Sequence, residues 1–143
     1  MMLTFHFAVT VFMTGVIWIV QVVIYPQLHL VPEGDFIQYE KSHMRRIGFV
    51  VGPMMFLEFF SALYLMIKGE IPEELLIAFY WSIALGIIIG LSTAIIQAPL
   101  HGQLAAEGKV DQKINKIINS NWIRTIAWSG RTILIGFIIY SSS

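Results

Sequence analysis

Four long apolar segments dominate the sequence and restrict what it can fold into. They occupy about residues 3–25, 47–67, 75–100 and 122–140 of the 143-residue chain. An α-helix rises 1.5 Å per residue, so each segment is long enough to cross a hydrocarbon layer of about 30 Å. Within that layer the backbone hydrogen bonds must be satisfied inside the chain, which continuous apolar runs achieve as helices. The sequence therefore predicts an all-α fold with four membrane-spanning helices.

The composition supports the same interpretation. Hydrophobic residues make up 57% of the chain and charged residues 13%, and the mean hydropathy is +0.74. A soluble domain has about 45–50% apolar and about 25% charged residues, so this chain has too few charges for a water-facing surface. The net charge is zero and no basic arm is present, so nucleic acid is not an expected partner. Without cysteine, the chain has no disulfide, thiolate ligand or cysteine nucleophile.

The connections between the segments are short, which predicts an up-and-down four-helix bundle in the membrane, as a single domain over residues 1–143. Asp35 is a good N-cap residue, and it predicts a short interfacial helix that leads into the second span. Asp111 predicts a similar short interfacial helix before the fourth span. Pro53 predicts a kink near the start of the second span.

Lysine and arginine are distributed unequally between the two ends of the predicted bundle. One end carries only Lys68. The positive-inside rule therefore places the other end in the cytoplasm and both termini outside, in a multi-pass protein of the cell inner (plasma) membrane. The basic residues of the cytoplasmic end are Lys41, Arg45, Arg46, Lys109, Lys113, Lys116 and Arg124.

Each span carries one polar stripe when its residues are placed at 100° intervals around a helix. A charged side chain at mid-membrane costs at least about 2.5–3.5 kcal/mol on insertion scales, so the stripes should face one another. Up-and-down threading brings most of these polar residues to the cytoplasmic half of the bundle, where we expect a small-molecule or cofactor pocket. The candidate catalytic residues are His43, His101 and Arg124, and the candidate ligand-binding residues are Trp18, Gln21, Tyr25, Arg46, Gln97, Asn121, Trp122 and Trp128.

These residue types suit a metal-free pocket for a flat apolar ligand. His43 would accept a proton, and Arg46 or Arg124 would bind an anionic or carbonyl oxygen. Tyr25 and the tryptophans would pack against the ligand. The alternative for the aromatic residues is the belt that such side chains form at membrane interfaces.

A metal site is a second interpretation of the same residues. Glu40-x-x-His43 has the i, i+3 spacing of carboxylate-bridged metal sites in helical bundles. A di-iron centre needs two such motifs, and the chain has one. Glu40, His43 and His101, with or without His29, could hold a single zinc or iron ion. His43 and His101 could alternatively be axial haem ligands, or Glu40 and His43 could only cap and solvate a helix end.

Two further ionisable residues lie deeper in the predicted bundle. Glu58 is near the middle of the second span and Arg131 near the middle of the fourth. We expect a structural ion pair between them, because a lone buried arginine needs a counter-charge. His6 lies near the opposite membrane face and is expected to be unrelated to the pocket.

Several motifs are similar to those of known membrane proteins. The motifs are Tyr25-Pro26, Phe36-x-x-Tyr39-x-x-x-His43, Pro53, Gln97-x-Pro99-x-His101 and Asn121-Trp122-x-Arg124-Thr125-x-x-Trp128-x-x-Arg131. Together they resemble a family of small, uncharacterised four-span bacterial integral membrane proteins. More distantly, they resemble the anthrone oxygenase-like membrane proteins. The resemblance implies the four-span fold and brings no established activity.

The sequence leaves three classes of function open. The first is a pocket for an apolar, quinone-like or aromatic molecule that arrives through the lipid bilayer, with redox or proton-transfer chemistry if the chain is an enzyme. The second is a non-catalytic accessory subunit of a larger membrane complex. The third is a carrier for a small solute, although four spans without an inverted repeat are too few unless the protein forms a homo-oligomer.

Overall fold

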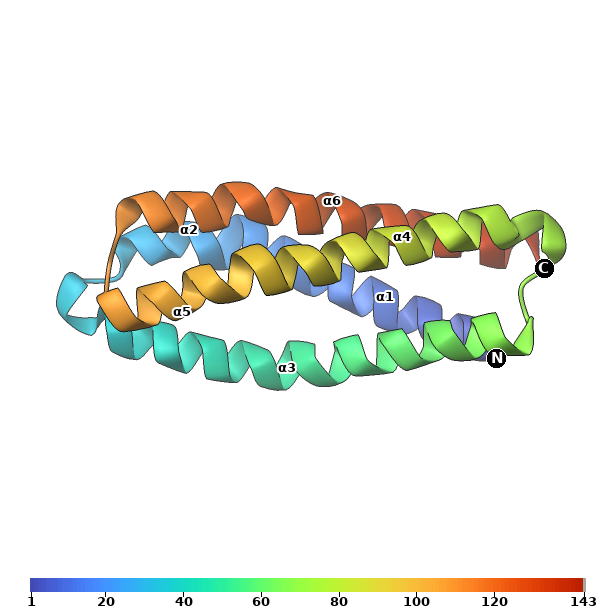
Figure 1. Cartoon of the computed structure of the whole chain (residues 1–143), viewed down its shortest axis with the longest axis horizontal. Coiled ribbons are helices and arrows are strands. Elements are labelled where there is room, and N and C mark those ends of the chain that lie inside the picture. Colours follow the sequence, from blue (N-terminus) through green and yellow to red (C-terminus); the bar gives the residue numbers. More distant parts are fainter. Residues whose placement is uncertain (143) are drawn as a thin grey trace.

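The computed structural model describes residues 1–142 as four long helical rods joined by short turns (Figure 1). All four rods are long and apolar enough to cross a membrane, and no β-strand is present in residues 1–142. The prediction of an all-α fold with four long apolar helices is therefore confirmed. The rods comprise residues Met2–Leu30, Glu33–Lys68, Glu73–Glu107 and Asp111–Ser141.

The first and third rods each contain one turn of π-helix within otherwise regular structure. The first rod consists of α1 (Met2–Ile19), the π turn η1 (Val20–Ile24), α2 (Tyr25–Gln27) and the 3₁₀ turn η2 (Leu28–Leu30). The third consists of η3 (Glu73–Leu75), α4 (Leu76–Ser92), the π turn η4 (Thr93–Gln97) and α5 (Ala98–Glu107). The second and fourth rods are the single helices α3 (Glu33–Lys68) and α6 (Asp111–Ser141).

A proline follows each π turn and explains its position. Pro26 comes directly after η1 and its flanking Tyr25, and Pro99 follows η4 in the same way. Proline has no N–H to give to the carbonyl four residues earlier, so the ladder of α-helical hydrogen bonds is interrupted there. A π turn absorbs the irregularity without ending the helix, and such turns are frequent at functional sites.

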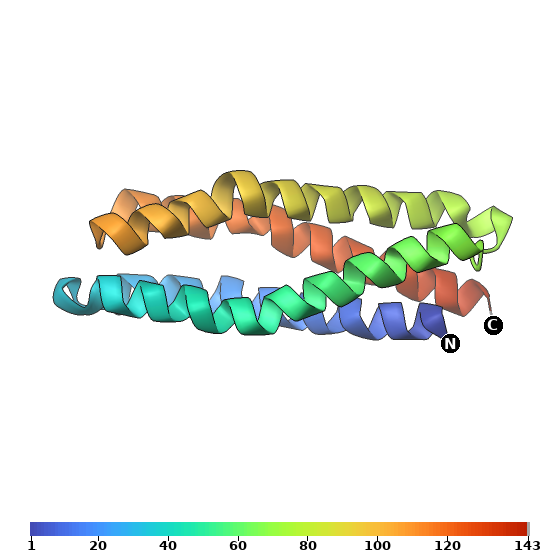
Figure 2. The ribbon, with the colours of Figure 1, turned by 60° about the horizontal axis from the view of Figure 1, so that its bottom comes forward.

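The rods form a closed bundle in which each one contacts two neighbours. The first rod lies between α3 and α6, and α6 lies between the first and third rods. The bundle closes where α3 contacts α5, whereas α3 and α4 do not pack closely along their length. Figures 1 and 2 show α1, α3, α4–α5 and α6 running along the long axis, with the two ends of the chain at one end of the bundle.

The buried side chains form two apolar clusters, one in each half of the bundle. The cluster nearer the α2–α3 and α5–α6 turns includes Phe36, Ile117 and Trp128. The other, nearer the two termini, includes Phe79 and Ile135. Two glycines with positive φ allow the chain to reverse direction between rods, Gly69 after α3 (φ 63°) and Gly108 before α6 (φ 91°). The polar clusters described below lie between helices that these apolar contacts hold in register.

Two local expectations differ from the structure, and a third agrees with it. The short interfacial helices before the second and fourth spans are not separate elements, because α3 and α6 run on without interruption. Asp35 does not cap α3, which already begins at Glu33 after the N-cap Pro32; Asp35 lies in the first turn, where its charge suits the helix dipole. The expected kink agrees with the structure: Pro53 lies inside α3, and α3 changes direction near its middle (Figure 2).

Candidate functional site

Three side chains from three different rods are joined by hydrogen bonds in the half of the bundle that contains α2 and α5. The Tyr25 hydroxyl lies 2.9 Å from Nε2 of His101, and Nδ1 of His101 contacts the carboxylate of Glu40. A carboxylate only accepts hydrogen bonds, so His101 Nδ1 donates to Glu40 and Nε2 accepts from Tyr25. The three residues form a relay, called here the Tyr25–His101–Glu40 relay.

The relay is buried, and the two π turns lie directly beside it. Tyr25 is the first residue after η1, and His101 lies in the first turn of α5 after η4. Glu40 is completely buried on α3, and its Oε2 has no hydrogen-bond partner among residues 1–142. A buried carboxylate is costly unless it is paired, so Glu40 relies on His101 for its stability.

Arg124 of α6 places a positive charge beside the relay. Its guanidinium group interacts with the Tyr25 hydroxyl, and its Nη1 donates to Oδ1 of Asn121 at 3.3 Å. Arg124 is buried, and its Nε has no hydrogen-bond partner in the described part of the chain. One donor of this buried guanidinium group is therefore left without a partner in the described chain.

A polar amide from η1 holds Asn121 in this orientation. Oε1 of Gln21 accepts hydrogen bonds from Asn121 Nδ2 at 2.9 Å and from the Thr125 hydroxyl at 3.3 Å. Its Nε2 donates to the backbone carbonyl of Ile118 at 3.2 Å. Gln21 and Asn121 thus bind the first rod to α6 and position Arg124.

The relay opens onto a cavity of about 310 Å³ between the first rod, α3, the third rod and α6. Only a few of the residues that line it are polar or ionisable: Tyr25, His43, Thr93, Gln97, His101 and Arg124. Gln97 is buried, and its Oε1 has no hydrogen-bond partner among residues 1–142. The rest of the wall is apolar side chains and glycine: Met13, Val16, Ile17, Val20, Met44, Ile47, Gly48, Val51, Gly52 and Ala98. An apolar wall with a few convergent polar groups is typical of small-molecule sites.

His43 lies in this cavity wall next to the relay. The centroid of its ring is 5.6 Å from that of His101, and the ring also stacks on Tyr39 with a centroid separation of 6.3 Å. The structure thus brings the three predicted catalytic residues, His43, His101 and Arg124, to the same cavity.

The geometry does not support the metal and haem interpretations. Both ring nitrogens of His101 are engaged, one by Tyr25 and one by Glu40, so neither has a free lone pair directed at a shared ion. Within residues 1–142, no group of three or more His, Cys, Asp or Glu side chains is placed to hold a metal ion. His29 lies apart, with Asp111 and Asn115 at 3.1 Å each.

Several residues that the helical-wheel analysis assigned to the pocket lie outside it. Arg46 is exposed, and its Nε donates to Ser42 one turn earlier. Trp18 and Trp122 are 43% and 42% exposed and meet edge to face on the outer surface. Trp128 is buried in the core, where the Arg131 guanidinium lies over its ring, 5.2 Å from the centroid.

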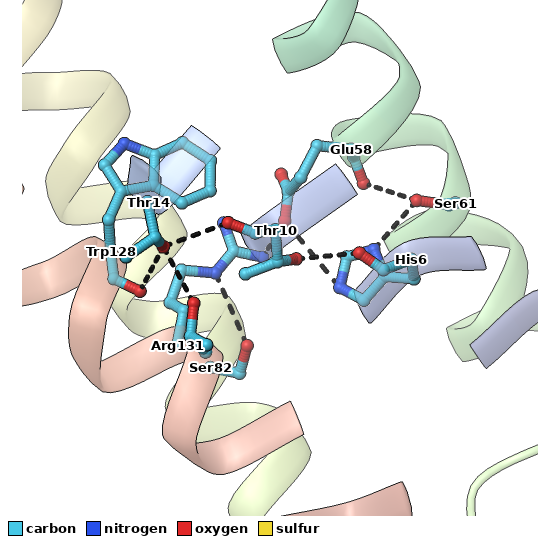
Figure 3. A network of polar contacts seen from close by, with 9 residues as sticks. His6, Thr10, Thr14, Glu58, Ser61, Ser82, Trp128 and Arg131 are labelled. Atoms are coloured by element: carbon cyan, nitrogen blue, oxygen red, sulfur yellow. Dashed lines mark hydrogen bonds and ion pairs between the residues drawn. The ribbon is translucent and has the colours of Figure 1, made fainter. Parts of the chain in front are cut away.

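The structure joins Glu58 and Arg131 in an ion pair near the middle of the bundle. Figure 3 shows the polar network around this pair, with side chains from α1, α3, α4 and α6. Arg131 Nε also donates to the Ser82 hydroxyl at 3.4 Å. Residue 86 is glycine, and a Cβ there would lie 2.7 Å from Arg131 Nη1. Gly86 therefore makes room for the Arg131 guanidinium group.

His6 is part of this second network, which the sequence analysis did not predict. It is completely buried, its Nδ1 lies 2.8 Å from the Ser61 hydroxyl, and its Nε2 lies 3.7 Å from Glu58 Oε1. A signal was present: His6, Thr10 and Thr14 recur at four-residue intervals on one face of α1. Thr14 extends the network to α6 by a contact of 2.7 Å with the Thr132 hydroxyl.

Comparisons with known proteins do not supply a function. No family model matches the chain, and no curated protein or solved structure shows significant similarity to it. The resemblance to four-span bacterial membrane proteins therefore stays a prediction.

Proposed function

We propose that this chain is an integral membrane protein that binds a small apolar molecule in the 310 Å³ cavity and exchanges a proton with it. The observation that carries the proposal is the Tyr25–His101–Glu40 relay, a buried chain of hydrogen bonds that begins at the cavity wall. A purely structural bundle does not need a buried carboxylate with an imidazole and a phenol in series. The proposed location is the inner (plasma) membrane, with four spans and both termini outside.

The hydrogen bonds of the relay point in the donor-to-acceptor direction that proton transfer from a ligand requires. A ligand hydroxyl that donates to the Tyr25 oxygen can pass its proton to Tyr25 while Tyr25 passes its own proton to His101 Nε2. The resulting imidazolium is stabilised by the Glu40 carboxylate, and the ligand oxyanion is stabilised by Arg124. One proton moves from the ligand to His101, and the reverse sequence returns it.

The polar atoms of the cavity also define the ligand. Arg124 Nε is a free donor and Gln97 Oε1 a free acceptor, both in buried side chains. A phenol or quinol hydroxyl suits these groups in turn. It can accept a hydrogen bond from Arg124, and it can donate its one proton either to Gln97 or, when the proton is transferred, to the Tyr25 oxygen. The remaining wall is apolar, so the body of the ligand is an apolar or aromatic ring.

A chromogenic phenol tests this proposal directly. The purified protein in detergent is titrated with a butyl-substituted nitrophenol, whose phenolate and phenol forms absorb at different wavelengths. We expect the protein-bound probe to be phenolate under conditions in which the probe in detergent alone is protonated. A spectrum equal to that of the probe in detergent alone would contradict the proposal.

Variants assign the effect to the relay. Tyr25→Phe and Glu40→Gln should leave the bound probe protonated, because the first removes the hydroxyl that links the ligand to His101 and the second removes the charge that stabilises the imidazolium. Arg124→Gln should weaken binding about tenfold or more, since a hydrogen bond to a charged group contributes about 1.5–3 kcal/mol. Tyr64→Phe is the matched control, because Tyr64 is a part-exposed tyrosine on α3 outside the cavity lining. If Tyr25→Phe and Tyr64→Phe behave alike, the relay has no part in the exchange.

A further inference from the structure

A second cavity of about 340 Å³ lies beside the first, between α3 and α4. Most of its wall is apolar and is formed by Met55, Phe59, Ala62, Leu63, Met66, Ile83 and Ile87. Gly86, Gly90, Glu58 and Arg131 complete it. The cavity occupies the region in which α3 and α4 do not pack closely along their length.

The two cavities follow one seam of the bundle. On α3 the first cavity ends at Gly52 and the second begins at Met55, less than one turn further along. On the third rod the first cavity ends at Thr93 and the second begins at Gly90, again less than one turn away. The lining of α3 from His43 to Met66 therefore covers about 35 Å of helix.

The seam faces outward along both cavities. Gly48 and Gly52 line the first cavity and are themselves exposed. Phe59 and Ile87 line the second and are 60% and 58% exposed. A molecule in the surrounding lipid can therefore enter from the side, between α3 and the third rod, without passing through the ends of the bundle.

The two cavities differ in whether their polar groups already have hydrogen-bond or ion-pair partners. In the first, Gln97 Oε1 and Arg124 Nε are buried without partners in the described chain. In the second, Glu58 and Arg131 satisfy each other in an ion pair, and Arg131 Nε is bonded to Ser82. The first cavity suits a polar head, whereas the second offers apolar walls and a charge pair that is already neutralised.

We infer that the seam binds one long-chain amphiphile, with a phenol- or quinol-type head in the first cavity and its hydrocarbon chain along the second. The inference rests on the proposed function, since the head is the group that exchanges a proton with Tyr25. It adds the substrate class, because a ligand without a chain would fill only half of the seam. The chain cavity extends along α3 from Met55 to Met66, about 17 Å of helix, which a hexadecyl chain can fill.

Photocrosslinking in lipid nanodiscs tests the position of the chain. The probe is a phenol with a hexadecyl chain and a diazirine near the chain end, and labelled residues are identified by mass spectrometry. We expect labelling of Met55, Ala62 and Ile83 on the wall of the second cavity. Predominant labelling of Phe56, Phe60 and Ile95, whose side chains are 63%, 47% and 68% exposed and do not line the cavity, would overturn the inference.

A glycine substitution that blocks the second cavity, compared with a control substitution elsewhere, also tests the position of the chain. Gly90 lines the second cavity with no atom within 4 Å of an added Cβ, so Gly90→Phe should fill the cavity and abolish labelling of Ala62. Binding of the butyl-substituted nitrophenol, which does not reach this cavity, should be unchanged. Gly15→Phe is the control, because Gly15 is equally unobstructed but lies on the outer surface of α1.

These outcomes separate the two proposals. If the wild-type protein does not bind the butyl probe, the proposed function itself fails. If the butyl probe binds and exchanges its proton while the long probe labels only the outer surface, the head site stands and the chain site is wrong. If Gly90→Phe does not fold, the wild-type labelling pattern decides the question alone.

Discussion

Arg131 Nη1 lies 2.7 Å from the position that a Cβ atom at residue 86 would occupy, so a side chain at residue 86 and the Arg131 guanidinium cannot both fit without one of them moving. Gly86→Ala should displace the guanidinium from Glu58 and lower the free energy of unfolding by about 1–3 kcal/mol, as overpacking typically does. Unfolding in mixed detergent–SDS micelles, followed by circular dichroism, measures the loss.

The control for this prediction is Gly90, the next glycine on α4. An added methyl group at Gly90 meets no atom within 4 Å. Replacing glycine by alanine in a helix otherwise stabilises it by about 0.5–1 kcal/mol. Gly90→Ala should therefore be neutral or stabilising, and equal destabilisation by the two variants would contradict a specific contact between residue 86 and Arg131.

The ion pair of Glu58 and Arg131 should be costly to break and inexpensive to replace. Glu58→Gln removes the counter-charge of a buried arginine and should destabilise the protein by about 3–5 kcal/mol. The double variant Glu58→Leu, Arg131→Leu removes both charges and should recover most of that loss. If Glu58→Gln is as stable as the wild type, Arg131 does not depend on this carboxylate.

The contact between His6 and Ser61 should appear as a coupling energy. The two side chains lie 2.8 Å apart and are buried, and contacting pairs typically show coupling of about 0.5–3 kcal/mol. A double-mutant cycle of His6→Phe and Ser61→Ala, measured by the same unfolding experiment, gives this value. Additive effects of the two substitutions would mean that the contact contributes nothing to stability.

The orientation in the membrane can be determined by cysteine labelling, because the natural chain contains no cysteine. Gln112→Cys lies at the end of the bundle rich in lysine, and Glu70→Cys lies in the turn between α3 and η3 at the other end. With the positive-inside orientation, a membrane-impermeant maleimide added to intact cells should label Glu70→Cys only. Labelling of Gln112→Cys without cell lysis would reverse the proposed topology.

The four long helices and the Glu58–Arg131 partnership follow from the sequence because both depend on coarse properties. Length and apolarity are sufficient to predict a helix of membrane-spanning size. A deeply buried arginine needs an acid, and the chain has one acid at a comparable depth, Glu58 on α3. Neither inference depends on the angle at which any side chain leaves its helix.

The composition of the pocket was harder to predict because it depends on helical phase. Trp18 shares a sector with Gln21 and Tyr25 when every residue advances 100° around the helix. The π turn η1 intervenes, and a π turn closes over more residues than an α turn, so the advance per residue is smaller there. Trp18 consequently faces outward, whereas Gln21 and Tyr25 are buried in the bundle.

Arg46 and His6 also show what helical spacing cannot predict. Arg46 was expected in the pocket and lies outside it, whereas His6 was assigned no partner and is part of a buried network. Arg46 follows Ser42 by one turn on α3, and a local hydrogen bond to that hydroxyl holds it on the outer surface. His6 reaches a partner on α3 that is 55 positions away in the chain. Helical spacing identifies which residues share a face, but the partner opposite that face is set by the packing of the rods.

The separation of α3 from α4 has a consequence for how binding would be measured. In the proposed mode of binding, the seam is filled by lateral diffusion within the bilayer, so the concentration that would govern occupancy is the mole fraction of ligand among lipids. Adding ligand-free lipid at constant total ligand should reduce occupancy, while diluting the whole suspension with buffer should not. Apparent dissociation constants for this protein are therefore comparable only at equal ligand-to-lipid ratios.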